Sequence, residues 1–228
     1  HTQRRRQRQM CIRDRLSKMN EILNFLFQQY GSYSQVDIGL EIFAVFFGFI
    51  SVWFSKNNNV LVFPTGLINT SIFVYLLFKW ELLGDMIINA YYFVVSIYGW
   101  YYWTRKNSNN DYTPISKVNY NDQKIILVIS ILSAIFVSLM YTVFNKWSGL
   151  VSYIDILTTS IFFAAMWLMA RRKIESWIFW IIGDIISTPL YLYKGLTFTS
   201  FQYFIFTFIA IAGYYKWKSI YNRKNQIV

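Results

Sequence analysis

The chain has 228 residues, of which 55% are apolar, 21% aromatic and only 14% charged, and its formal net charge is +11. Soluble domains carry about 25% charged residues, so this chain lacks the polar surface that a water-soluble globule needs. The composition excludes a cytosolic enzyme and a disordered protein. It predicts an all-α polytopic protein, which crosses the membrane several times.

A short basic head holds much of the positive charge. Residues 1–18 contain seven basic side chains and one acid, which leaves 15 basic and 10 acidic residues in the rest of the chain. No apolar stretch follows these charges, as it would in a signal peptide. We interpret this head as an artefact of cloning or of a translated adapter, with Met19 as the true start. A nucleic-acid-binding arm is the alternative, but we expect no nucleic-acid partner.

The residue types beyond the head limit the chemistry. The only histidine is His1 and the only cysteine is Cys11. Disulfides, thiol nucleophiles, histidine bases and the usual zinc and haem ligands are therefore excluded from the rest of the chain. We expect no enzymatic activity, no cofactor and no metal site.

Seven stretches are long and apolar enough to span a bilayer, which takes about 20 residues per helix. In chain order they are 37–55, 61–79, 82–104, 124–145, 150–170, 175–193 and 198–218. Residues 19–36 precede them as an interfacial segment. A polar loop, 105–123, separates the third span from the fourth, and a tail, 219–228, follows the last.

The basic residues beyond the head predict the orientation. When loops are assigned alternately to two sides, twelve basic residues fall on the side of the C-terminus and three, Lys79, Lys146 and Lys194, on the other. The positive-inside rule then places the C-terminus, loop 105–123 and tail 219–228 in the cytoplasm and the N-terminus outside.

An internal repeat relates the two halves at an offset of 114 residues. The pairs that share this offset include Trp53 with Trp167, Gly99 with Gly213, and Trp103 with Trp217. Ranges 37–104 and 150–218 then form two three-helix repeats, and 124–146 is the helix that links them. Four crossings separate matching helices, so the repeats are parallel. We predict a 3+1+3 arrangement with a binding site between the halves.

The third span carries polar and aromatic candidates for that site. Asn89 and Tyr92 lie one turn apart on a polar stripe. Polar groups at membrane depth are costly and normally face a cavity or a neighbouring helix, and for these two we favour the cavity. The motif at the end of the span adds Trp100 and Trp103.

The sixth span carries Trp177, Trp180 and Asp184 at i, i+3 and i+7, on one helical face. Indole faces stack on aromatic rings and attract positive charge, and a carboxylate accepts hydrogen bonds from hydroxyls. The pattern favours a flat ligand that is cationic or rich in hydroxyls, although Trp177 also suits an interfacial aromatic belt. Gln202 and Tyr203 in the last span complete the candidate set.

Several short motifs lie between residues 51 and 184. They are Ser51-Val-Trp53, Phe63-Pro-Thr-Gly66, Gly84-Asp85, Asn89-Ala-Tyr-Tyr92, Gly99-Trp-Tyr-Tyr-Trp103 and Trp177-x-x-Trp180-x-x-x-Asp184. In combination they resemble the Pnu-type bacterial vitamin transporter family over about residues 20 to 220. The resemblance implies pocket roles for Trp177, Trp180 and Asp184.

The same resemblance implies a fold similar to the SWEET sugar transporters and a homo-trimer in the bacterial inner membrane. It implies uptake of nicotinamide riboside by facilitated diffusion, with cytoplasmic phosphorylation trapping the product. Thiamin, another aromatic cation, fits the same pocket chemistry. Related members also carry riboflavin or deoxynucleosides.

Three other classes make different demands on the sequence. A retinal photoreceptor needs a lysine deep in the last span, and residues 204–212 contain none. A membrane enzyme needs clustered histidine, cysteine or paired carboxylates at depth. A proton-coupled carrier stays open as an alternative, because a buried aspartate can relay protons.

Overall fold

The computed structural model describes residues 34–80, 83–106, 112–194 and 197–226. These residues form seven helices: α2 (Gln35–Lys56), α3 (Val62–Lys79), α4 (Leu83–Thr104), α5 (Tyr120–Val143), α6 (Leu150–Ala170), α7 (Ser176–Tyr193) and α8 (Thr197–Gln226). Each helix coincides with one of the seven expected spans. The basic head 1–18 and nearly all of the interfacial segment 19–36 lie outside the described residues.

Side-chain caps fix the beginnings of two helices. The Ser34 hydroxyl accepts a hydrogen bond from the backbone N–H of Asp37 at 3.1 Å, where α2 begins. Asn119 and Asp122 form a reciprocal capping box at the start of α5, which satisfies backbone N–H groups that the helix leaves free. The box explains why α5 begins at Tyr120 rather than at residue 124.

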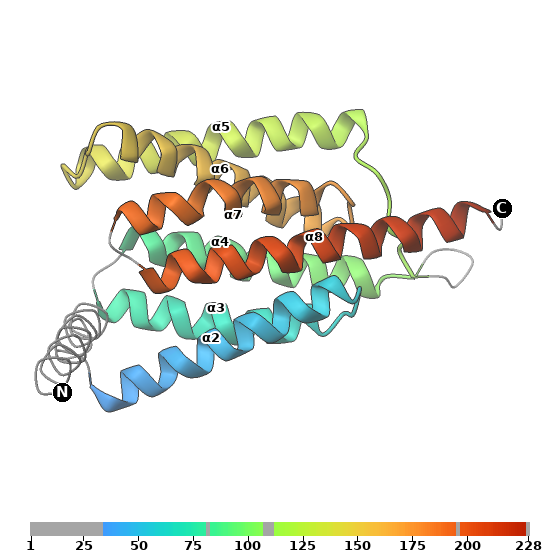
Figure 1. The fold of residues 1–228 in the computed structure, drawn as a ribbon, viewed down its shortest axis with the longest axis horizontal. Helices are drawn as coiled ribbons and strands as arrows, with labels where there is room; N and C mark the ends of the chain where they lie inside the picture. Colours follow the sequence, from blue (N-terminus) through green and yellow to red (C-terminus); the bar gives the residue numbers. More distant parts are fainter. Residues whose placement is uncertain (1–33, 81–82, 107–111, 195–196, 227–228) are drawn as a thin grey trace, which may run out of the picture.

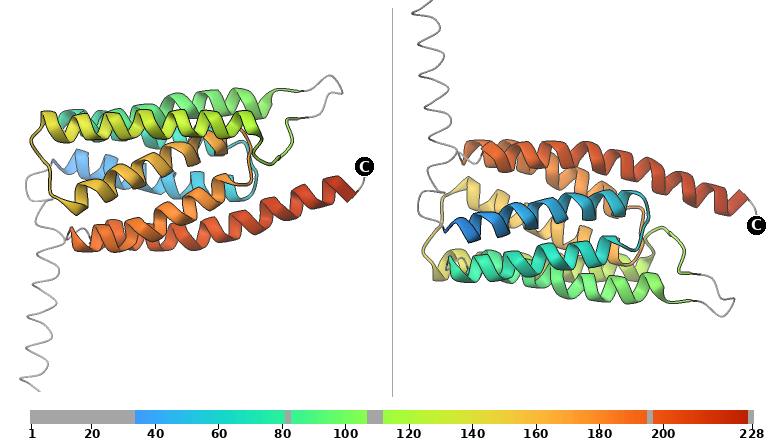
Figure 2. Two further views of the ribbon diagram at one scale, coloured as in Figure 1. Left: turned by 90° about the horizontal axis from the view of Figure 1, so that it is seen from above. Right: turned by 90° about the horizontal axis from the view of Figure 1, so that it is seen from below.

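The helices run side by side (Figures 1 and 2). We call α2, α3 and α4 the first group and α6, α7 and α8 the second, according to their contacts. Helix α3 packs against α2 and α4, and α7 packs against α6 and α8. The groups meet where α4 packs against α6 and where α2 packs against α8, whereas α5 packs along α6. Both figures show that the C-terminal end of α8 extends past the other helices.

Helix α8 continues to Gln226, beyond the expected end of the span at residue 218. Its last turns are polar, but they contain neither proline nor glycine, so the backbone can remain helical outside the apolar region. Most of the expected tail 219–228 is therefore helix. We call the end of the bundle where α8 terminates the C-terminal end, and the other the opposite end.

Four of the helices, α2, α3, α5 and α6, are long and apolar enough to cross a membrane. Helices α4, α7 and α8 contain 22, 18 and 30 residues and are richer in tryptophan and tyrosine. On α5, large apolar side chains such as Leu127, Ile135 and Leu139 are 61%, 60% and 54% exposed. Such a surface is stable against lipid rather than water, so the fold is that of a multi-pass membrane protein.

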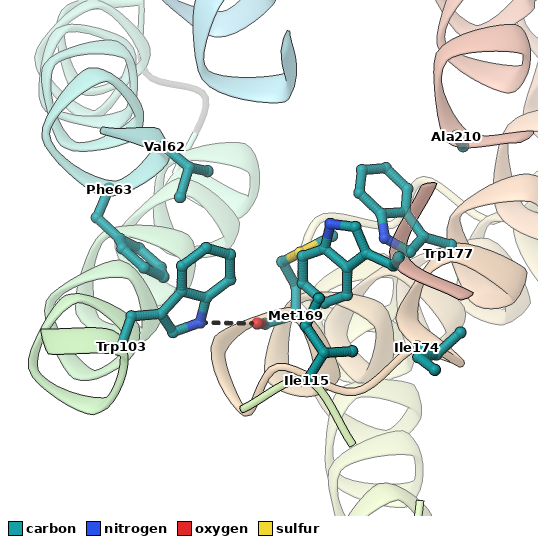
Figure 3. Packing of buried hydrophobic residues seen from close by; sticks show 9 residues of the cluster. Val62, Phe63, Trp103, Ile115, Met169, Ile174, Trp177 and Ala210 are labelled. Carbon is teal, nitrogen blue, oxygen red and sulfur yellow. Dashed lines mark hydrogen bonds between the residues drawn. The ribbon is translucent and has the colours of Figure 1, made fainter. Parts of the chain in front are cut away.

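A cluster of buried side chains fills the C-terminal end of the bundle (Figure 3). Its members are Val62, Phe63, Trp103, Ile115, Met169, Ile174, Trp177, Ala210 and Trp217. The rings of Trp103 and Trp217 lie 5.6 Å apart between centroids. Because these two residues belong to α4 and α8, the cluster joins both groups of helices.

Candidate functional site

A cavity of about 430 Å³ lies between the two groups of helices. Its lining comes from α2, α3 and α4 on one side and from α6, α7 and α8 on the other. Cavities of this size are large enough to hold a small organic ligand. Phe63, Met169 and Trp177 belong both to the lining and to the buried cluster, so the cluster forms the floor of the cavity at the C-terminal end.

Seven of the nine candidate residues from the sequence line this cavity. They are Asn89, Tyr92, Trp177, Trp180, Asp184, Gln202 and Tyr203. They come from three helices, α4, α7 and α8, that are distant in the chain. The i, i+3, i+7 spacing on α7 therefore does place its three residues on the face directed toward the other half of the bundle.

The α7 and α8 side of the cavity is aromatic. The ring of Phe162 lies 5.5 Å from Trp180 and stacks on Tyr203 at 5.6 Å, and Tyr203 lies 5.1 Å from Tyr191. Gly183 makes this packing possible, because a Cβ there would lie 2.4 Å from a ring atom of Phe162. The result is a continuous aromatic surface on one side of the ligand space.

The α2 and α3 side combines small and polar residues with apolar ones such as Val52 and Phe73. Gly66 lies opposite the aromatic side, and a Cβ there would come within 3.1 Å of the Ser51 hydroxyl. The Asn69 side chain donates to the Ala44 carbonyl at 2.7 Å, and the Thr70 hydroxyl donates to the Gly66 carbonyl at 2.9 Å. These local hydrogen bonds satisfy the polar groups and leave space beside the aromatic surface.

The charged side chains that line the cavity are all acidic. They are Asp85, Asp155 and Asp184, and the described residues that line the cavity include no lysine or arginine. Asp155 is paired with Lys194 at 2.5 Å and also accepts a hydrogen bond from the Tyr141 hydroxyl. Asp184 is 2% exposed, and no basic side chain in the described part of the chain forms an ion pair with it. A cationic ligand fits this distribution of charge.

The other two candidates do not reach the cavity. Trp100 is 41% exposed on the outside of α4. Trp103 is 2% exposed within the cluster, where its indole N–H points to the carbonyl of Met169 at 3.3 Å and of Ala170 at 3.2 Å (Figure 3). We therefore leave both residues out of the proposed ligand contacts.

Two hydrogen bonds close the bundle below the cavity floor, and they match because their donors, and likewise their acceptors, are 114 residues apart. The Trp103 indole of α4 donates to the end of α6, and the Trp217 indole of α8 donates to the Ser55 carbonyl of α2 at 3.0 Å. Both bonds are buried and cross from one group of helices to the other. Opening the C-terminal end would take these acceptors away from the two indole N–H groups, at a cost of about 1–3 kcal/mol for each donor that stays buried, whereas the Ser55 and Met169 carbonyls keep backbone N–H partners.

Ion pairs stand at the opposite end. Lys79 of α3 binds Asp37 of α2 at 2.7 Å, and Lys194 binds Asp155 of α6. Each pair joins helices of the same group, whereas the tryptophan bonds join different groups. The two groups are thus tied together more firmly at the C-terminal end.

Comparison with known proteins matches residues 38–219 to the sequence model of the nicotinamide mononucleotide transporter family. The chain is 24% identical over 203 residues to the nicotinamide riboside transporter PnuC of Escherichia coli K12, covering 78% of this chain and 84% of the relative. It is 23% identical over 147 residues to the riboflavin/roseoflavin transporter RibM of Streptomyces davaonensis, covering 61% and 66%.

A crystal structure of the vitamin B3 transporter PnuC shares the fold, with a TM-score of 0.60, 20% identity, and coverage of 89% of this chain and 90% of the other. The sequence relatives are transporters rather than enzymes, in agreement with the apolar helices and the absence of histidine and cysteine beyond the head. The chain is a membrane transporter and belongs to the nicotinamide mononucleotide transporter family.

Proposed function

We propose that this protein takes up nicotinamide riboside by facilitated diffusion through alternating access, and that cytoplasmic phosphorylation traps the product. The observation that supports this most strongly is the cavity, which has an aromatic side, a buried carboxylate and no basic lining residue. The pyridinium ring of nicotinamide riboside is flat and positively charged. It can stack on an indole and receive electrostatic stabilisation from a carboxylate.

The charge of the cavity favours the riboside over its 5′-phosphate. A mononucleotide brings a phosphate group of charge close to −2 into contact with the protein. Among the described residues the lining offers it three carboxylates, one of which is paired with Lys194, and no lysine or arginine, so the phosphate would lose its hydration and meet charges of the same sign. Removing the phosphate removes that penalty and leaves the cation.

Thiamin remains the alternative ligand of the same class, because it is also an aromatic cation. Riboflavin, which the relative RibM is named for, is neutral and would gain little from Asp184. A proton-coupled carrier remains the alternative mechanism, since Asp184 is buried and has no basic partner among the described residues.

We assign the ligand contacts by chemistry. Trp180 stacks on the ring and Asp184 provides the opposing charge. Asn89, Gln202 and Tyr203 exchange hydrogen bonds with the ribose hydroxyls. Tyr92 and Trp177 complete the enclosure and exclude water.

The proposal includes a 3+1+3 arrangement of two parallel three-helix repeats, with α5 as the linker, as in the SWEET transporters. A rotation that exchanges the repeats carries the contact of α4 with α6 onto that of α8 with α2, and both contacts are present. Ser55 and Met169 are separated by 114 residues, and their side chains meet at 3.0 Å. Equivalent residues that touch lie beside the axis that relates the repeats.

The remaining parts of the proposal concern the membrane and the assembly. The excess of basic residues places the C-terminal end of the bundle in the cytoplasm of a bacterium, with the N-terminus outside. The cavity would then be closed toward the cytoplasm by the buried cluster in the inner membrane. The family resemblance further implies a homo-trimer.

Calorimetric titration of the purified protein tests the ligand. The panel is nicotinamide riboside, its 5′-phosphate, thiamin, riboflavin and a deoxynucleoside. We expect nicotinamide riboside to bind most tightly and Trp180→Ala to weaken that binding, whereas the control Trp100→Ala binds normally because Trp100 lies outside the cavity. Tighter binding of the 5′-phosphate, or equal binding by the two variants, would overturn the assignment. Uptake into liposomes then tests transport.

A further inference from the structure

A second cavity, of about 360 Å³, lies at the C-terminal end of the bundle. It is lined by Asn58 after α2, by Tyr112, Thr113, Pro114, Ile115 and Ser116 before α5, by Arg172 after α6, and by Ile220, Tyr221 and Lys224 of α8. It shares none of its described lining residues with the cavity between the two groups of helices, which we call the transport cavity. Its volume lies within the range of about 300–1,000 Å³ that ligand sites occupy.

Arg172 is the central residue of this second cavity. It adopts a left-handed backbone conformation, with φ of 57°, in the turn between α6 and α7. Its guanidinium lies 4.4 Å from the ring of Trp103 and donates to the Thr113 carbonyl and, at 2.9 Å, to the Asn58 side chain. Its Nε atom is buried and has no hydrogen-bond partner among the described residues. One donor of the guanidinium is thus unused within this part of the structure.

Two acidic side chains at this end of the bundle are engaged elsewhere. Asp122 pairs with Lys173 at 2.7 Å and with Arg171 at 3.8 Å, and Glu175 accepts from the Val118 N–H at 3.0 Å. Within the described ranges no carboxylate forms an ion pair with Arg172. Burial lowers the pKa of its guanidinium to about 10, as expected for a cation that has lost water without gaining a counter-ion.

Other side chains around the cavity are also donors. Lys224 and the hydroxyls of Ser116, Tyr112 and Tyr221 line it, and none of its described lining residues is acidic. Two further ammonium groups stand at its edge, with Lys106 5.6 Å from the ring of Tyr112 and Lys117 5.5 Å from the ring of Tyr221. Clustered cations in a concave site raise the local concentration of anions.

We propose that this second cavity binds a phosphate-bearing anion. Arg172 and Lys224 provide the charge, the hydroxyls donate to the remaining phosphate oxygens, and the two tyrosine rings flank whatever carries the phosphate. A guanidinium suits this role because its planar fork matches the oxygens of a phosphate. A soluble nucleotide and a phospholipid headgroup both present this group. A bound anion would also hold Arg172 against Asn58 and so stabilise the closed C-terminal end.

The test measures thermal stabilisation and affinity of the full chain with three probes. AMP and inorganic phosphate are titrated into protein in detergent, and phosphatidylcholine nanodiscs with and without phosphatidylglycerol supply the headgroup. The variants are Arg172→Gln and Lys224→Gln. The matched control is Lys218→Gln, since Lys218 lies on the same helix but does not line the cavity.

We expect at least one probe to stabilise the wild type and Lys218→Gln, and each cavity variant to bind it about tenfold or more weakly. Binding of AMP or phosphate in detergent would identify a soluble source, and stabilisation only by phosphatidylglycerol would identify the lipid. No response to any probe, or unchanged binding by Lys224→Gln, would overturn the proposal. Lys224 is exposed, so its variant keeps the fold if Arg172→Gln does not. Nicotinamide riboside should bind Lys224→Gln normally, which separates this site from transport.

Discussion

The substitution Asp184→Asn tests whether charge, rather than shape, selects the ligand. Asparagine keeps the size of the side chain and one carbonyl oxygen but removes the negative charge. Asp184 is 2% exposed and lies on the α7 side of the transport cavity. Its interaction with a bound cation is therefore weakly screened by water and salt.

The expected loss follows from the burial of the pair. Two unit charges 4 Å apart attract by about 4 kcal/mol at an effective dielectric constant of 20. Part of this gain is offset because both charges lose water when the ligand binds. We take about half as the net contribution, roughly 2 kcal/mol, which corresponds to a dissociation constant about 30-fold higher in the variant.

Calorimetry with a matched pair of ligands isolates the charge. Nicotinamide riboside is a cation, and its dihydro form has nearly the same shape but a neutral ring. We expect Asp184→Asn to lose about 30-fold in affinity for the cation and less than about threefold for the neutral form. Equal losses would show that Asp184 holds a hydroxyl rather than the ring charge. An unchanged affinity for both ligands, in a variant that still unfolds cooperatively, would remove Asp184 from the site.

Three further results are expected. Gly99→Ala and Gly213→Ala should each destabilise the protein by about 1–3 kcal/mol in thermal unfolding, because each added Cβ would lie within 2.7 Å of an aromatic ring. The control Gly39→Ala should not destabilise it, because no described atom beyond its chain neighbours and the backbone of its own helix would lie within 4 Å of the added Cβ. Trp103→Phe and Trp217→Phe should lower stability by similar amounts, about 1–3 kcal/mol, since each removes one matching indole bond; a large effect of only one would contradict the repeat. Uptake into liposomes should be unchanged when a proton gradient is dissipated, and a loss of uptake would favour the proton-coupled alternative.

The helices follow from sequence because apolar length is a local property. A helix lies at each of the seven predicted positions in the described part of the chain, and the helix ends differ from the predicted ends where local chemistry other than hydropathy decides. A capping box moves the start of α5 to Tyr120, and helix-compatible polar residues extend α8 to Gln226. Hydropathy marks where a helix leaves the apolar layer and does not mark where it ends.

The site was predicted less completely, because periodicity gives the face of a helix but not the depth of a residue. Trp103 lies on the same helical face as Tyr92, but it is eleven residues further along α4. At 1.5 Å per residue this places it about 16 Å away, below the cavity floor. Phe162 was missed because it stands in an entirely apolar run, 161–170, in which no polar residue marks the face that meets the cavity. The signal that identifies it is Gly183 on the neighbouring helix, and only the packing of the two helices shows what that glycine accommodates.

In the proposed repeat, equivalent positions carry similar residues at the closed C-terminal end and different residues in the transport cavity. This difference suits the two tasks, which are closing the bundle and binding the ligand. At the C-terminal end the offset equates Phe63 with Trp177 and Trp103 with Trp217. The edge-on contact of Phe63 with Trp103 in the first half, at 5.0 Å, therefore corresponds to the edge-on contact of Trp177 with Trp217 in the second, at 5.6 Å. In the cavity the same offset pairs Gly66 with Trp180 and Thr70 with Asp184.

Closure requires that both halves make the same contact, so that they separate together. A ligand with a charged ring at one end and a sugar at the other has no symmetry, and equivalent positions must differ to bind it. Exchanging Gly66 and Trp180 between the halves would therefore preserve the cluster that closes the bundle but move the stacking surface to α3, away from Asp184. A protein with this double exchange that still bound nicotinamide riboside normally would show that the division of roles between the halves is not what selects the ligand.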